Sequence, residues 1–167
     1  MGLEIRRFNT ADSIVELTLL IRRAYLRLAE MGFNYTGAYQ DEAMTLERME
    51  GNECYVLVEN ERLIGTITLH RHSRYYAGSN VWFARPEVAL CGQFAVEPER
   101  QHQGIGSKLM DAVEKRAAEL GAAELALDTA EGAKHLVFFY TRRGYRFIDT
   151  MQHSGKTYRS VILSKTL

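Results

Sequence analysis

Residues 88–120 constrain the fold of this chain more than any other stretch. Val88–Val96 is largely apolar and lies between Pro86 and Pro98, which predicts a strand buried on both faces. The turn Gln101–Gly106 follows, and after it apolar residues recur along one helical stripe: Ile105, Leu109, Ala112, Val113, Ala117 and Leu120. A helix start leaves backbone N–H groups unpaired, so this turn predicts a site for an anion, phosphate above all.

Two familiar phosphate motifs do not fit this turn. A P-loop needs a glycine five residues before its Gly-Lys pair, whereas here Gly106 is followed by Ser107-Lys108 and no such glycine precedes it. The dinucleotide fingerprint needs a third small residue where Leu109 stands. A nucleotide-binding switch therefore stays only as a remote alternative, and the pattern that remains is Gln-x-x-Gly-x-Gly after a buried strand.

Composition excludes several classes of protein. The 167 residues, 46% of them hydrophobic, predict one domain over residues 1–167. Lys+Arg and Asp+Glu both total 21, so no overall field directs the chain to nucleic acid or to an anionic membrane. No apolar run approaches the ~20 residues of a membrane span, and the first residues lack a signal peptide's apolar segment. Cys54 and Cys91 are isolated, with no zinc spacing, which predicts a metal-free, cytoplasmic protein.

Hydrophobic periodicity on either side of this stretch predicts a mixed α/β fold. We expect a central twisted sheet of six or seven strands flanked by about four helices, with Thr10 capping the first helix. Val88–Val96 and Glu124–Thr129 would form a parallel strand–helix–strand crossover. The other expected strands are 3–8, 54–58, 63–69, 145–148 and 158–163, and the other expected helices run to about Met31, over Asp41–Met49 and up to Gly144.

Two motifs together resemble the GCN5-related N-acetyltransferase (GNAT) superfamily. The first is Gln101-x-x-Gly104-x-Gly106 after a strand and a Glu-Pro turn, and the second is Phe139-Tyr140-x-x-x-Gly144-Tyr145. The order of elements also matches that superfamily over nearly the whole chain. The resemblance implies an acyl-CoA N-acyltransferase fold with acetyl-CoA as co-substrate and no metal.

The resemblance also assigns roles to residues. It implies that backbone groups of Phe94, Ala95 and Val96 hold the pantetheine arm and that Tyr140 protonates the departing thiolate. A backbone N–H near Phe94 would stabilise the oxyanion, and transfer would be direct, so that Cys91 is not a nucleophile. The residues implied to cradle the pyrophosphate are Gln101, His102, Gln103, Gly104, Ile105, Gly106 and Ser107.

Two departures from the superfamily pattern stand out. Ala133 occupies the position where many members carry an asparagine that contacts pantetheine, so Thr129 or Lys134 would have to take its place. The strand over residues 88–93 carries no carboxylate to accept the substrate's proton. The neighbouring candidates for that base are Glu87, Glu97, His70 and His72, and each is more typical of a turn or of an exposed position.

The acceptor substrate is expected among aromatic side chains of the first two helices and of the segment before Val88. These are Tyr25, Phe33, Tyr35, Tyr39, Tyr75, Tyr76, Trp82 and Phe83, with Glu30, Asp41 and Glu42 nearby in sequence. Such rings would wall a pocket for an amine, but loop packing or a homodimer contact would use them equally well.

The function hypothesis is therefore transfer of an acetyl group from acetyl-CoA to a primary amine of a small molecule. One alternative is a protein lysine or N-terminal acetyltransferase, for which an open acidic groove would speak. The other is a non-catalytic acyl-CoA-binding sensor, which the alanine at position 133 and the missing strand carboxylate keep open.

Overall fold

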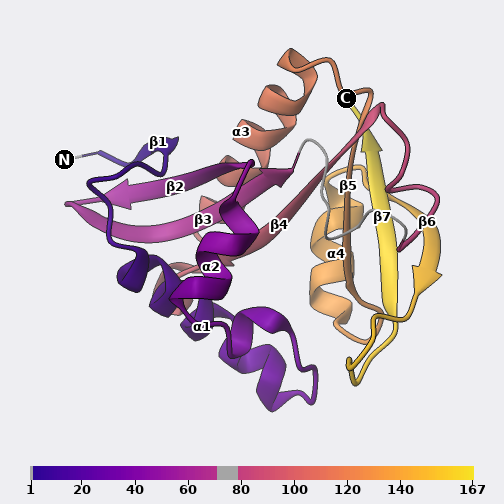
Figure 1. The fold of residues 1–167 in the computed structure, drawn as a ribbon, viewed down its shortest axis with the longest axis horizontal. Coiled ribbons are helices and arrows are strands. Elements are labelled where there is room, and N and C mark those ends of the chain that lie inside the picture. Colours follow the sequence, from indigo (N-terminus) through magenta and orange to yellow (C-terminus); the bar gives the residue numbers. More distant parts are fainter. Residues whose placement is uncertain (1, 71–78) are drawn as a thin grey trace.

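The computed structural model describes residues 2–70 and 79–167, and within them it shows a seven-stranded mixed sheet with four α-helices (Figure 1). The strand order is β1-β2-β3-β4-β5-β7-β6. The strands are β1 (Glu4–Arg7), β2 (Glu53–Glu59), β3 (Arg62–His70), β4 (Val88–Val96), β5 (Glu124–Ala130), β6 (Arg146–Met151) and β7 (Ser160–Thr166). The α-helices are α1 (Ile14–Glu30), α2 (Glu42–Met49), α3 (Ile105–Glu119) and α4 (Lys134–Arg142), and short 3₁₀ turns lie at η1 (Thr36–Ala38) and η2 (Pro98–Arg100).

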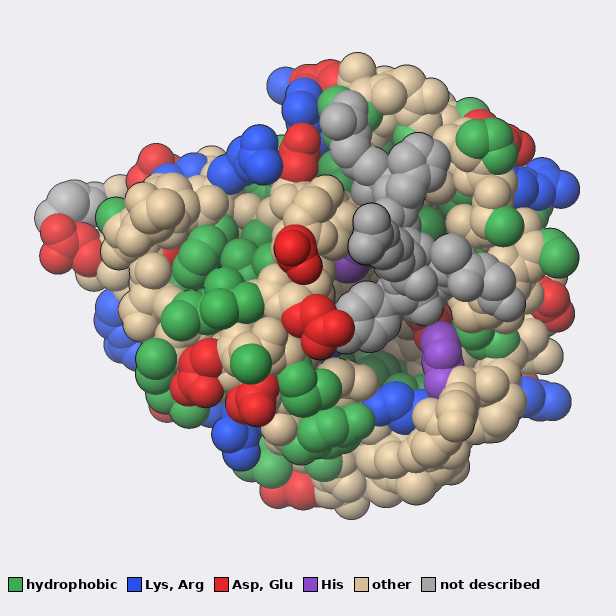
Figure 2. Space-filling view, viewed as in Figure 1, with side chains coloured by type: hydrophobic (Ala, Val, Ile, Leu, Met, Phe, Trp, Pro, Cys, Tyr) green, Lys and Arg blue, Asp and Glu red, His purple; other side chains and the backbone are tan. Residues whose placement is uncertain are grey.

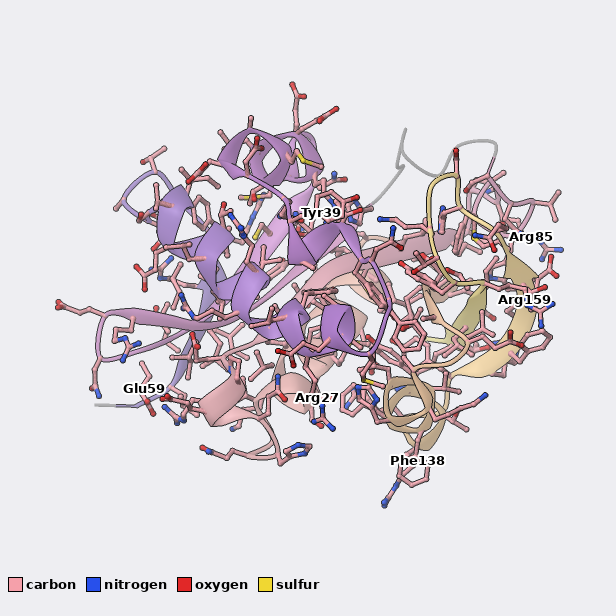
Figure 3. All side chains as sticks on the ribbon, turned by 90° about the horizontal axis from the view of Figure 1, so that it is seen from below. Arg27, Tyr39, Glu59, Arg85, Phe138 and Arg159 are labelled. Carbon is pink, nitrogen blue, oxygen red and sulfur yellow. The ribbon has the colours of Figure 1, made fainter. Side chains whose placement is uncertain are left out.

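The helices cover the two faces of the sheet in pairs. α1 and α2 lie on one face, and α3 and α4 lie on the other (Figures 1 and 3). The apolar stripe of α3 packs on the main core, where Leu109 and Val113 are fully buried. On the opposite face, Leu17, Leu20 and Ile21 of α1 pack on strands β2 to β4. Burial on both faces explains why β4 reads as an apolar run.

The two central strands diverge, and this places the site. β4 and β5 pair in parallel only between Val88–Leu90 and Glu124–Ala126, and beyond Leu90 they separate (Figure 1). On its other side β4 keeps its antiparallel pairing with β3, interrupted by a bulge where Gln93 has a φ of 48°. The edge of β4 that faces β5 is therefore left without a strand partner in the described part of the chain, and such an edge can accept an extended ligand.

The expected order of elements is confirmed, including the parallel pairing of the two central strands. The prediction for the helix cap was wrong, because Ser13, not Thr10, is the N-cap of α1 and its Oγ accepts from Glu16 N. Asp12 lies before the helix and binds Arg6 at 2.7 Å, which fixes the turn that contains Thr10.

Smaller differences concern the last two strands. β6 extends to Met151, three residues past the predicted end, and β7 begins at Ser160 rather than at position 158. Tyr158 instead packs against Phe33 and Tyr35 beneath the turn, so a residue with high strand propensity serves loop packing.

Two further findings concern the described residues. None of the helices in 2–70 and 79–167 combines the length and the apolar character that crossing a membrane requires. In the same ranges, no three His, Cys, Asp or Glu side chains are grouped so that they could hold a metal ion.

Candidate functional site

A cavity of about 830 Å³ passes through the sheet where β4 and β5 separate. Tyr25 and Leu28 of α1 line it from one face, and Leu136 and Phe139 of α4 line it from the other. The strands contribute the walls between them. This volume falls in the range of small-molecule and cofactor sites.

The turn before α3 forms one end of the cavity. His102 and Gly104 both adopt positive φ angles, 61° and 80°, so the chain bends sharply before the helix begins. Gln101 Nε2 donates to Val96 O at 3.2 Å and holds the turn against the end of β4. A side-chain carbon at Gly106 would lie 3.1 Å from Phe94 Cζ, which leaves little room for any substituent there. Backbone N–H groups at this helix start can therefore approach a phosphate closely.

Cationic side chains surround the same end. Arg27, His102, His135 and Arg142 line the cavity, and no carboxylate in the described residues forms an ion pair with Arg27 or Arg142. Burial lowers the pKa of His135, and the nearby charges of Arg27 and His102 lower it further. Figure 3 shows Arg27 and Phe138 on the same side of the molecule, and Tyr39 on the opposite side. This end of the cavity therefore suits an anion.

Most of the residues that the sequence predicts for the cofactor lie together in this cavity. Those that line it are Phe94, Ala95, Val96, Gln101, His102, Gly104, Gly106 and Ser107. Gln103 and Ile105 do not line it. The Gln103 side chain turns back to Glu99 O and Arg100, and Ile105 is buried in the main core with its side chain away from the cavity. Either residue could contribute only through its backbone.

Tyr140 lies at the middle of the cavity wall. Its ring stacks at an angle on Phe94, with centroids 6.4 Å apart, and contacts Tyr145 edge-on. Burial raises the pKa of Tyr140 well above its ordinary value, so its hydroxyl keeps its proton at neutral pH. No hydrogen-bond partner in the described residues binds this hydroxyl, which leaves it available to a ligand.

Cys91 also borders the cavity but is poorly suited to attack. Its side chain is buried, and burial raises the pKa of the thiol to about 12. The thiolate, which is the nucleophilic form, is therefore scarce at neutral pH.

The position of Ala133 is structural. Ala133 is fully buried at the start of α4, where it packs with Leu28 and Ala130. Thr129 lines the cavity, but its Oγ1 is bonded to the hydroxyl of Tyr35 at 2.8 Å. Lys134 is exposed and does not line the cavity. Neither side chain therefore replaces the missing asparagine directly.

The other end of the cavity contains part of the predicted aromatic set. Tyr25 and Tyr35 line it, and the Tyr35 hydroxyl also accepts from Ala130 N at 2.8 Å, which ties the segment after α1 to the end of β5. Phe33 packs on Tyr158 and Tyr39 is largely exposed. Tyr75 and Tyr76 lie outside the described residues.

Trp82 and Phe83 do not belong to this pocket. They pack with Val88, Ala126 and Ile162 in a separate cluster over β4, β5 and β7. Trp82 also lies under Arg85, whose guanidinium carbon is 4.3 Å from the ring centroid. The prediction that these two rings frame an acceptor pocket is thus wrong, because the sheet face needed its own apolar cover.

None of the described candidates for a base lies in the cavity. Glu97 binds Arg23 through two hydrogen bonds of 2.7 and 2.9 Å, and Glu87 is exposed beside Arg85. His70 is buried, and burial lowers its pKa to about 4. His72 lies outside the described residues. Glu30, Asp41 and Glu42 are exposed and do not line the cavity, and Asp41 caps α2.

The sequence reasoning did not single out four charged groups near this end. Asp128 of β5 is the one carboxylate that lines the cavity among the described residues, and His153 Nε2 lies 2.7 Å from its Oδ2. Arg48 and Lys156 are half-buried cations on either side of Tyr39. Asp128 carried a weak signal, since it is the one acid within an apolar strand. The other three come from helix or loop segments without any pattern.

Comparison with known sequences identifies close relatives. The profile of the Acetyltransferase (GNAT) family matches residues 20–145. The chain is 31% identical over 163 residues to the S-(2-succino)cysteine N-acetyltransferase of Bacillus subtilis (strain 168), covering 94% of this chain and 90% of that protein. It is 30% identical over 166 residues to the S-alkylcysteine N-acetyltransferase of the same organism, covering 93% and 85%.

Solved structures share the fold. A GNAT family acetyltransferase from Elizabethkingia anophelis, crystallised with acetyl-CoA bound, superposes with a TM-score of 0.69 at 16% identity, covering 99% of this chain and 98% of that chain. The seven-stranded sheet with its splayed centre is thus the fold of these enzymes. On its sequence and its fold, the chain belongs to the GNAT acetyltransferase family and is an N-acetyltransferase.

Proposed function

We propose that this enzyme transfers an acetyl group from acetyl-CoA to the α-amino group of a small amino acid of the S-substituted cysteine class, by direct attack in a ternary complex. The observation that carries the proposal is the single cavity through the sheet, which has a phosphate-suited turn at one end and a separate polar end at the other. Both reactants can then meet beside Tyr140 without a covalent enzyme intermediate.

The residues at the first end fit acetyl-CoA. Backbone N–H groups between Gln101 and Ser107 would hold the pyrophosphate at the start of α3, and Arg27 and Arg142 would add positive charge. The unpaired edge of β4 at Phe94, Ala95 and Val96 would bond the pantetheine arm as an added strand does. Because these contacts use the backbone, the alanine at position 133 need not weaken them.

Tyr140 would serve the chemistry. When bound, acetyl-CoA supplies an activated acyl group on a thiol leaving group. The Tyr140 hydroxyl faces the cavity with its proton retained, so it can donate that proton to the thiolate. Cys91 stays a buried thiol and would not form an acyl-enzyme.

Charges at the other end favour an acceptor that carries a carboxylate. Arg48 Nη1 donates to Gln40 Oε1 at 2.6 Å, and Lys156 Nζ donates to Asn34 O, Thr36 Oγ1 and Tyr39 Oη. Neither cation has an ion-pair partner among the described carboxylates, and the undescribed positions, 1 and 71–78, contain no Asp or Glu.

These two cations differ from the others that lack a carboxylate partner. In the described ranges, the remaining ones are all exposed: Arg22, Arg27, Arg62, Lys108, Lys134 and Arg142. A half-buried charge without a counter-ion is costly, and an anionic substrate would relieve that cost. The hollow on the face shown in Figure 2 has blue, purple and green side chains at its border, which fits a polar substrate with an apolar arm. The relatives' own substrates, as their names state, are S-substituted cysteines.

The test is an acceptor panel with acetyl-CoA, read as release of the CoA thiol. We expect turnover of S-(2-succino)cysteine or an S-alkylcysteine, and a value of kcat/KM at least about 10-fold lower for the matching carboxamide, which lacks the α-carboxylate. Turnover of peptides alone would instead indicate a protein acetyltransferase. Tight binding of acetyl-CoA with no turnover of any amine would indicate a sensor.

The same proposal includes the location. We expect the reaction in the cytoplasm, in keeping with two buried cysteines, Cys54 and Cys91, that remain unbridged thiols.

A further inference from the structure

The acceptor needs a group that removes its proton, and the residues considered from the sequence do not supply one. An α-amino group is an ammonium ion at neutral pH and attacks only after it has lost a proton. Glu97 is bound to Arg23, Glu87 points to solvent, and His70 is buried outside the cavity. Asp128 is the one carboxylate on the cavity wall in the part of the chain that the structure describes.

Asp128 lies where the two reactants would meet. It belongs to β5 at the point where this strand has separated from β4, and Leu127 and Thr129 line the cavity beside it. Its negative charge raises the pKa of Tyr25, Tyr140 and Cys91, which places all three near the carboxylate. A cationic amine beside Tyr140 would thus meet Asp128 as its nearest anion.

His153 supports Asp128 from the loop between β6 and β7. Its Nε2 lies 2.7 Å from Asp128 Oδ2, and the pair is mostly enclosed, with the two side chains 26% and 13% exposed. The carboxylate raises the pKa of His153 above its ordinary value, with Lys156 acting weakly in the opposite sense. The second oxygen, Oδ1, makes no hydrogen bond within the described residues and is free for a substrate.

We propose that Asp128 accepts the proton of the acceptor's ammonium group and that His153 positions this carboxylate and passes the proton to solvent. The inference rests on the proposed function, because it assumes that a small amine binds in the cavity. Asp128 would be the catalytic residue, and His153 would be a positioning residue that acts through it.

The step balances as follows. One N–H bond of the ammonium breaks and its proton goes to the Asp128–His153 pair. The neutral nitrogen forms a C–N bond with the acetyl carbon, the C–S bond breaks, and Tyr140 gives its proton to the sulfur. The second N–H proton, lost as the amide forms, restores the Tyr140 hydroxyl. The net result is one amide, one CoA thiol and one proton released to solvent.

The pair can accept a proton only while His153 is neutral. Because its pKa is raised, kcat/KM is expected to rise with pH through a value above the ordinary 6.5 of histidine. The other titratable groups that face Asp128 are Tyr25 of α1, Tyr35 of the following segment, Cys91 of β4 and Tyr140 of α4. All four have raised pKa values and stay neutral in this range, so the rise belongs to the pair.

The experiment compares pH profiles of kcat/KM for the full chain, with acetyl-CoA and an S-alkylcysteine, in wild type, Asp128→Asn and His153→Gln. At pH 7, Asp128→Asn should lose about 100-fold or more, as expected for removal of a general base. The loss should shrink as the pH approaches the amine's own pKa, since free amine then forms without help. His153→Gln should lose less and should abolish the rise in the wild-type profile.

The controls separate this role from a structural one. Asp149→Asn makes the same chemical change at an exposed position on β6 and should leave the profile unchanged. Acetyl-CoA affinity and thermal unfolding of Asp128→Asn should remain near wild type. An equal loss at every pH, or no loss at all, would overturn the inference while leaving the proposed function standing. If the wild type acetylates no small amine, the proposed function fails, and this inference fails with it.

Discussion

The two ends of the cavity are built in different ways. The cofactor end comes from one continuous stretch, in which β4, the turn over residues 97–104 and the start of α3 follow each other in the chain. Its contacts are mainly backbone N–H groups and the edge of a strand. The acceptor end is assembled from side chains of α1, α2, the segment around η1, β5 and the loop before β7.

This difference explains what each end can do. Backbone donors at a helix start bind any phosphate and tolerate changes of most side chains, so the cofactor end suits a co-substrate that does not vary. The acceptor end depends on individual groups such as Asp128, Arg48 and Tyr35, each held by partners distant in sequence. A single substitution there can change the acceptor without disturbing the cofactor.

The largest effect is expected from blocking the backbone cradle. Gly106→Val should weaken acetyl-CoA binding by about 1,000-fold, because a side chain there meets Phe94 and would cost roughly 4 kcal/mol of phosphate contacts. Isothermal titration with acetyl-CoA measures the change. Gly2→Val, at a position with open space around it, is the matched control. Unchanged affinity in Gly106→Val would show that the phosphates bind elsewhere.

Removing the Tyr140 hydroxyl should have the next largest effect. Tyr140→Phe should lower kcat by about 100-fold and leave the acetyl-CoA dissociation constant near wild type, since the ring packing on Phe94 is kept. Steady-state kinetics and titration separate the two quantities. Tyr55→Phe changes a hydroxyl that bonds Glu53 far from the cavity and serves as the control. A kcat close to wild type would assign proton donation to another group or to water.

A smaller effect is expected at Arg48. Arg48→Gln should raise KM about 10-fold for an acceptor with a free α-carboxylate, but not for the corresponding carboxamide, because one charge-assisted contact of about 1.5 kcal/mol is lost. Arg62→Gln removes an exposed cation that also lacks a carboxylate partner and should change neither value. If both acceptors lose equally in Arg48→Gln, the guanidinium has only a structural role.

The smallest effect concerns the frame of the acceptor end. Tyr35→Phe removes the hydroxyl that bonds Thr129 Oγ1 and Ala130 N, and leaving that amide unpaired should cost about 1–2 kcal/mol of stability. Thermal unfolding should shift downward by about 3–6 °C, with KM for the acceptor raised and acetyl-CoA affinity unchanged. Tyr39→Phe, on a largely exposed ring, is the control for stability. A loss confined to acetyl-CoA binding would contradict the separation of the two ends.

The contrast also determines what could be predicted from the sequence. Apolar periodicity and the glycine turn are local signals, and they predicted the order of elements and the residues around Gln101–Ser107. Helix capping was missed at Ser13 because two adjacent segments offered suitable caps and the Arg6–Asp12 ion pair decided between them. The Asp128–His153 and Arg48–Gln40 contacts join residues distant in sequence or depend on the absence of a partner, and no local pattern encodes either.

The central claim is that both reactants occupy one cavity together and react directly. Initial velocities measured at several fixed concentrations of an S-alkylcysteine, with acetyl-CoA varied, test it most simply. Lines that intersect in the double-reciprocal plot are the result expected of a ternary complex, and Cys91→Ala should give the same pattern. Parallel lines, together with an acetylated enzyme recovered in the absence of the acceptor, would contradict direct transfer and require a covalent intermediate.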